Sequence, residues 1–172
     1  MYLSFMEKTL ENLIGALSLI AADRIGDAVA GAYPRGGETP AALTAIGAAP
    51  GLTVSALQAV LRLSQPGAAR LVDRLVADGL AEKRSGKDAR QALVHLTPKG
   101  RRLRRKILDA RHDAISRITA PLSKKERNTF EALLNKMLSR YPSCEMDKYQ
   151  ACRMCDQSTC NPCPLPGAGI QR

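Results

Sequence analysis

The chain has 172 residues, a hydrophobic share of 45% and a formal net charge of +10 at pH 7. That length suits one domain with a short extension, and the composition is sufficient for a folded core. The longest apolar stretch, residues 13–22, is about half as long as a membrane-spanning helix needs to be. The first residues include Glu7 and Lys8 and lack the cleavage site of a secretory signal. We therefore expect a soluble, cytoplasmic protein without a membrane partner.

The positive charge is concentrated in one region. Residues 62–106 contain 13 Lys or Arg and 4 Asp or Glu, so this segment carries +9 of the total +10. A localised basic face indicates docking to nucleic acid, whereas evenly spread charge indicates non-specific adhesion. A basic helix that is simply solvated is the alternative for residues 99–106.

The first half of the chain predicts one long helix and one short helix. Residues 3–33 carry apolar residues at coiled-coil-like spacing, with Leu10, Leu13 and Leu17 on one narrow seam. A lone helix cannot bury such a seam, so this helix needs a partner. Residues 40–48 form a short, alanine-rich helix that Pro50 and Gly51 end.

The segment 53–97 predicts two short helices followed by a β-hairpin. Thr53 and Ser64 are suitable N-cap residues for the two helices, and Pro66 is tolerated in a first turn. Gly79 suits the left-handed position that ends a helix. The second helix has an apolar stripe of helical period, formed by Ala68, Leu71, Val72 and Leu75. Its opposite face carries Gln65, Gly67, Ala69, Arg70, Asp73 and Arg74.

Residues 80–84 and 92–96 have the composition of strands, and the polar loop SGKDARQ joins them with Gly86 as a turn residue. The basic loop residues Lys87 and Arg90 suit a phosphate backbone or a narrow minor groove, whose negative potential attracts arginine. The segment therefore predicts a winged helix-turn-helix that reads DNA. The expected fold class is mainly α with a small β-hairpin wing.

The pattern Asp88-x-Arg90-x-x-x-Val94-x-Leu96-Thr97, followed by Pro98-Lys99-Gly100, resembles the wing signature of the MarR family of bacterial transcription regulators. Residues 63–66 and 71–75 resemble its recognition helix, and the layout is similar over roughly residues 3–141. The resemblance implies that helix 64–78 lies in the major groove, that Arg90 enters the minor groove and that Asp88 orients the wing. Family members often carry Ser or Thr where this chain has Gly67 and Ala69. The candidate DNA-contacting residues are Thr53, Ser64, Gln65, Gly67, Ala69, Arg70, Arg74, Arg84, Lys87, Asp88 and Arg90.

Two further helices are expected after the hairpin. One runs from Pro98 to about Thr119, and the other covers 124–141 after a capping box at Ser123 and Glu126. In the resembled family, terminal helices interlock two chains. We expect helices 3–33 and 98–141 to form a homodimer around the DNA reader, defined as residues 40–98. A symmetric dimer presents two recognition helices ~34 Å apart, which matches a palindromic operator. A monomer that folds these helices back on itself is the alternative.

Residues 143–172 lack apolar periodicity and contain every cysteine of the chain. Four of them spell C-x2-C-x4-C-x2-C, and each C-x2-C can place two sulfurs on one metal. Disulfides are not expected in a reducing cytoplasm. We expect a metal-binding tail without a core of its own, with Cys144 spare and with zinc bound by Cys152, Cys155, Cys160 and Cys163. An iron–sulfur cluster is the alternative, because Cys155-x4-Cys160-x2-Cys163 has the plant-type ferredoxin spacing; a disordered, oxidisable tail is the third.

These patterns predict two regions, a MarR-like winged helix-turn-helix domain over 1–142 and a cysteine-rich tail over 143–172. We expect a non-enzymatic, sequence-specific repressor whose DNA binding responds to a small-molecule effector or to the redox or metal state of the tail. One alternative is a thiol-redox enzyme that uses a C-x-x-C motif, although no thioredoxin-like βαβ pattern surrounds the cysteines. The other is a non-specific architectural DNA-binding protein.

Overall fold

A computed structural model of the chain describes residues 2–86, 92–141, 145–160 and 162–165. Over these residues the protein is mainly helical with a small antiparallel sheet, which confirms the expected fold class. Its elements, in chain order, are α1 (Tyr2–Ala32), α2 (Thr39–Ala48), β1 (Leu52–Thr53), α3 (Val54–Leu61), α4 (Gln65–Ala77), β2 (Ala81–Ser85), β3 (Ala92–Leu96), α5 (Pro98–Thr119), α6 (Lys124–Leu138) and α7 (Glu145–Ala151).

The helix-turn-helix is formed by α3 and α4, and its predicted caps are confirmed. The Thr53 hydroxyl accepts from the backbone N–H of Ala56 at 3.1 Å, and the Ser64 hydroxyl accepts from that of Gly67 at 3.2 Å. Each bond satisfies a backbone donor that the first turn of a helix leaves unpaired. Gly79 follows α4 in the left-handed conformation, with φ of 67°. The local sequence therefore fixes where both helices begin and where the second one ends.

The wing is part of a three-stranded sheet in the order β1-β3-β2. The predicted hairpin pairs β2 with β3, with Ala81 opposite Leu96. The third strand, β1, pairs with the other edge of β3 and places Leu52 opposite Val94. Strand β1 could not be predicted from the sequence, because two residues are too few to show the alternation that marks a strand.

The core lies within the reader and extends into α5. Its fully buried side chains include Leu43 of α2, Leu57 of α3 and Leu71 of α4. Ile107 brings α5 into the same cluster and is also fully buried. The start of α5 packs closely on the end of the reader, because a Cβ atom on Gly100 would collide with the carbonyl oxygen of Leu80. The reader and α5 are thus one packed unit.

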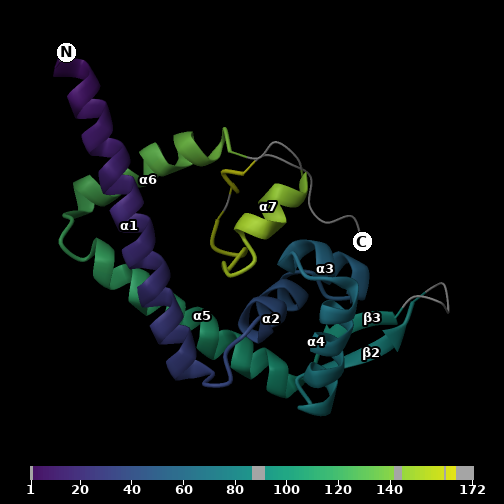
Figure 1. Ribbon diagram of the computed structural model, residues 1–172. Helices are drawn as coiled ribbons and strands as arrows, with labels where there is room; N and C mark the ends of the chain where they lie inside the picture. Colours follow the sequence, from purple (N-terminus) through teal and green to yellow (C-terminus); the bar gives the residue numbers. More distant parts are fainter. Residues whose placement is uncertain (1, 87–91, 142–144, 161, 166–172) are drawn as a thin grey trace.

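The long helices extend away from the reader, and α1 packs across α5 (Figure 1). The seam predicted on α1 is exposed in the single chain, with Leu10 at 60% and Leu13 at 62%. Helix α6 ends at Leu138, three residues before the predicted end, and contributes no buried residue within the described chain. Its apolar side chains Leu134 and Leu138 are both 38% exposed. Among the described residues, no helix is both long and apolar enough to span a membrane.

The cysteine tail packs onto the core of the reader, a contact that the sequence analysis did not predict. Its helix α7 packs against α3 (Figure 1), and Tyr149 is only 7% exposed within the core cluster. Farther along, Leu165 is 4% exposed. The seven residues of α7 are too few for a clear apolar period, and their partners lie about 90 positions earlier in the sequence.

Candidate nucleic-acid interface

Helix α4 separates its apolar and polar residues onto two faces. The predicted stripe, which includes Leu71, Val72 and Leu75, is buried at 2% exposure or less. Gln65, Ala69, Arg70 and Arg74 are all exposed on the opposite side. Residues four apart are neighbours on a helix, so Gln65 lies next to Ala69 and Arg70 lies next to Arg74. The fold therefore brings the predicted reading residues of α4 together on one accessible surface, which we call the α4 face.

The N-terminal turn of the α4 face combines a cap with polar groups. Ser64 is exposed, and its hydroxyl uses only its acceptor capacity to cap the helix. A hydroxyl also carries one donor, which remains available to a ligand. Gly67 is half-buried beside the Ser64 hydroxyl. Thr53 is also half-buried and caps α3, so its established role in the fold is structural.

An ion pair joins the α4 face to the wing. The Nζ of Lys83 donates to Asp73 Oδ1 at 2.7 Å, linking β2 to α4. On the same strand, Arg84 is exposed and its Nε donates to Glu82 Oε1 at 3.0 Å. Within the described residues, Arg70 and Arg74 form no ion pair, so their charges remain available to an anionic partner. The predicted wing residues Lys87, Asp88 and Arg90 lie outside the described residues.

The end of α4 is held by contacts that the sequence did not reveal. The Thr97 hydroxyl donates to the carbonyl of Gly79 at 2.7 Å and accepts from the backbone N–H of Gly100 at 3.1 Å. One side chain therefore caps α5 and fixes the turn after α4. The only sequence signal was the position of Thr97 immediately before Pro98, as expected for an N-cap residue.

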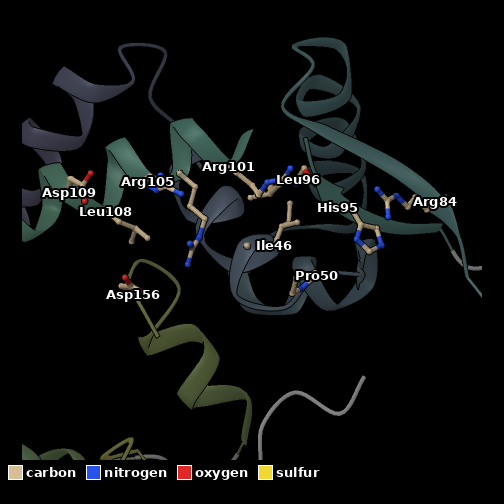
Figure 2. A pocket seen from close by; sticks show the side chains of 12 residues that line it. Ile46, Pro50, Arg84, His95, Leu96, Arg101, Arg105, Leu108, Asp109 and Asp156 are labelled. Atoms are coloured by element: carbon tan, nitrogen blue, oxygen red, sulfur yellow. Dashed lines mark hydrogen bonds between the residues drawn. The ribbon is translucent and has the colours of Figure 1, made fainter. Parts of the chain in front are cut away.

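A cavity of about 330 Å³ lies between the reader, α5 and the tail (Figure 2). Arg105 and Leu108 of α5 face the tail residue Asp156, whereas His95 and Arg84 lie toward the wing. Within the reader, α2 contributes Ile46 and Gly47 to the lining, and α5 also contributes Arg101 and Arg104. The Nε atom of Arg104 is buried without a hydrogen-bond partner among the described residues. The lining places four arginines against the two carboxylates of Asp109 and Asp156, and this excess of positive charge is chemically suited to an organic anion.

The structure brings two of the predicted metal ligands together. Cys152 and Cys155 are free thiols joined by a hydrogen bond, and Arg111 Nη2 donates to Cys155 Sγ at 3.4 Å. The hydrogen bond from Cys152, together with the charges of Arg111 and Arg153, lowers the pKa of Cys155 to about 6, although burial opposes the shift. The same hydrogen bond and burial raise the pKa of Cys152.

The other two cysteines, Cys160 and Cys163, are exposed. They lie close enough to Cys152 for their charges to raise its pKa. Over the described part of the chain, no group of three or more His, Cys, Asp or Glu residues is arranged to hold a metal ion. Cys144 lies outside the described residues. The four-cysteine metal site therefore stays a prediction, of which the structure supplies one adjacent pair.

The three strands and the helices α2 to α4 define the class of the protein as a winged helix-turn-helix. The sequence profile of the MarR family matches residues 38–91, which cover the reader from α2 into the wing loop. Transcriptional repressor MprA of Escherichia coli K12 is 32% identical over 94 residues, covering 54% of this chain and 53% of that protein. The regulator PetP of Rhodobacter capsulatus is 35% identical over 97 residues, covering 54% of this chain and 58% of that protein. The chain thus spans a little over half the length of these curated relatives.

Solved structures extend the similarity beyond the reader. A MarR family transcriptional regulator from Silicibacter pomeroyi aligns with a TM-score of 0.61 and 27% identity, covering 79% of this chain and 94% of that one. The family profile and the solved structures thus show similarity to MarR family proteins, and the curated relatives are named as regulators of transcription.

Proposed function

We propose that this chain is a sequence-specific DNA-binding regulator, and specifically a repressor that acts as a homodimer. The observation that carries the proposal is the α4 face. Gln65, Ala69 and Arg70 are exposed there, on a helix whose opposite face is packed into the core. Glutamine pairs well with adenine, arginine pairs well with guanine, and an alanine methyl can contact the methyl group of thymine. The repressor assignment is supported by the similarity to MprA.

The apolar residues left exposed on α1 and α6 support the dimer. Leu10, Leu13 and Leu17 form one row, and Leu133, Leu134 and Leu138 lie on the other helix. Soluble monomers rarely expose large contiguous apolar patches. Burying both rows against a second copy would form a symmetric dimer, and two readers ~34 Å apart would suit a palindromic operator.

Selection from a randomised duplex library tests the proposal directly. A sequence-specific dimer should enrich one motif with two inverted half-sites about one helical turn apart. An architectural DNA-binding protein should retain DNA without enriching any motif. The selected duplex and a scrambled duplex of the same composition then serve as matched probes for the variants described below.

We also propose that the cavity lined by Arg101, Arg104 and Arg105 receives an anionic effector. It adjoins the reader, α5 and the tail, so an occupant would contact the DNA-reading unit and the cysteine tail together. Support comes from the buried Nε of Arg104, which has no hydrogen-bond partner among the residues that the structure describes. Calorimetric titration with a panel of aromatic carboxylates should detect binding that Arg104→Leu abolishes. If no carboxylate binds the wild type and none alters its affinity for the selected duplex, this part of the proposal is wrong.

For the tail we propose a single zinc ion per chain on Cys152, Cys155, Cys160 and Cys163, with an iron–sulfur cluster as the alternative. The support is the spacing of the four thiols and the contact between the first two. Metal analysis of anaerobically purified protein should find one zinc per chain, whereas iron and a visible absorption band would favour the cluster. Changing any one of these four cysteines to Ser should lower the metal occupancy, whereas Cys144→Ser should not. Protein with neither metal would end the assignment.

A further inference from the structure

The tail contacts the helix-turn-helix at the connection between its two helices. Gln150, on the last turn of α7, makes two hydrogen bonds there with opposite ends of its amide group. Its Nε2 donates to the carbonyl of Ala59 at 3.1 Å, and its Oε1 accepts from Arg62 Nε at 2.6 Å. One tail side chain therefore holds both the last turn of α3 and the residue that follows α3.

The residue that Gln150 holds has an unfavourable backbone conformation. Arg62 has φ of 54° and is the only non-glycine residue with positive φ in the part of the chain that the structure describes. Side chains with a Cβ atom seldom adopt this conformation unless surrounding contacts enforce it. Its backbone N–H bonds to the same Ala59 carbonyl that Gln150 contacts. Ser64, the N-cap of α4, comes only two residues later, so the conformation at Arg62 sets the direction in which α4 leaves the turn.

Packing next to Gln150 fixes the helix that presents it. Tyr149 is 7% exposed and lies beside Val60 of α3 and Leu52 of β1. The space left among them is only about 10 Å³, so Tyr149 is closely packed. Because Tyr149 anchors α7 in this way, the neighbouring Gln150 amide reaches the turn from a rigid helix rather than from a mobile chain end.

We propose that Gln150 is a positioning residue for DNA recognition, which holds the turn at Arg62 so that α4 meets the major groove at the correct angle. This inference rests on the proposed DNA-binding function. It means that the tail supports the DNA reader structurally. It also couples the cysteines to the DNA-reading surface. Cys152 follows Gln150 by two residues, and its backbone N–H donates to the carbonyl of Lys148 in the same turn.

The test compares Gln150→Ala with Gln157→Ala, which removes an exposed glutamine from the same tail. Affinities are measured for the duplex selected by the wild type and for its scrambled partner. All samples are kept under reducing conditions and have the same zinc content. Gln150→Ala should weaken binding to the selected duplex by about 3- to 10-fold, the effect of one or two lost hydrogen bonds. Binding to scrambled DNA should change less than about 2-fold, because that binding depends on phosphate contacts. Gln157→Ala should leave both affinities unchanged.

Two further measurements separate positioning from a general loss of stability. Gln150→Glu keeps the acceptor for Arg62 and loses the donor to Ala59, so it should recover part of the lost affinity. Amide hydrogen exchange in Gln150→Ala should accelerate at Arg62 and Leu63, while the amides of α5 keep their protection. A loss shared equally by both duplexes, or faster exchange throughout the chain, would overturn the inference. If the wild type selects no motif at all, the proposed function fails instead, and the two failures are thereby distinguished.

Discussion

The guanidinium of Arg35 donates to Asp78 Oδ2 over 2.8 Å and joins the loop after α1 to the residue that caps the C-terminus of α4. The hydrogen bond and charge of Asp78 raise the pKa of Arg35. The backbone carbonyl of the same aspartate accepts from Lys99 Nζ at 2.8 Å, at the start of α5. The end of the reading helix is therefore tied to the two long helices that we expect to form the dimer.

Asp78→Ala should lower the melting temperature slightly, because it removes an ion pair that is partly exposed. The loss should be larger near 0.05 M salt than near 0.5 M salt, since the Debye length shrinks from roughly 14 Å to about 4 Å. Thermal melts at both salt concentrations measure it. Asp73→Ala, which breaks the exposed pair with Lys83, provides the comparison. An Asp78→Ala loss that is the same at both salt concentrations would show that the ion pair is not its source.

Arg70→Ala should relax base preference at one symmetric position of the selected duplex, because a bidentate arginine–guanine pair discriminates by about 1–3 kcal/mol. Competition assays with single-base variants of the duplex give this preference directly. Arg117→Ala, an exposed arginine near the end of α5, is the matched loss of charge and should leave the preference intact. Equal weakening on the selected and scrambled duplexes would instead assign Arg70 to the phosphate backbone.

Arg90→Ala should weaken DNA binding with little change in sequence preference. Loss of one phosphate contact lowers the slope of log affinity against log salt concentration by about one unit. Fluorescence anisotropy over a salt series yields both quantities. An unaltered slope and affinity would mean that the wing points away from the DNA.

Leu13→Asp should convert a dimer into a monomer that binds the selected duplex poorly. Leu13 is 62% exposed in the single chain, so the charge is tolerated there, but it would be buried between two chains. Analytical ultracentrifugation at micromolar concentration reports the change. Asn12→Asp adds the same charge at the neighbouring position, off the apolar seam, and should remain dimeric. Wild-type protein that sediments as a monomer would refute the dimer itself.

The cap of α6 should weaken in acid. Ser123 donates to Glu126 Oε2 from its hydroxyl at 2.7 Å and from its backbone N–H at 2.8 Å, and these bonds lower the pKa of Glu126 below its usual 4.5. A lowered folded-state pKa stabilises the fold above the unfolded pKa, and that contribution disappears as the pH falls through the folded value. The difference in melting temperature between wild type and Glu126→Ala should therefore shrink below pH 4.5. A constant difference across this range would exclude the carboxylate as the cause.

The parts of the fold that could be predicted are those that short-range sequence patterns specify. Ser64 and Pro98 mark the starts of α4 and α5, and both lie where a cap residue or a first-turn proline predicted them. The position of the tail depends on Tyr149 and Gln150 reaching residues far away in the sequence, and no local periodicity encodes such a contact. Likewise, the link from Arg35 to Asp78 spans 43 positions. The α4 face could be predicted because it lies opposite an apolar stripe. The long-range contacts that hold α4, made by Arg35 and Gln150, could not be predicted.

The Arg62–Gln150 hydrogen bond closes a loop of 88 positions, and this has a consequence for the order of events during synthesis. Chains emerge from the ribosome N-terminal end first, at roughly 5–20 residues per second. Helices α3 and α4 can therefore form several seconds before Gln150 exists to hold the turn between them. A nascent chain that stops short of α7 carries every residue of the α4 face but lacks the contact that we propose for its alignment. Competence to recognise an operator would then require synthesis to have passed α7, long after the α4 face itself is complete.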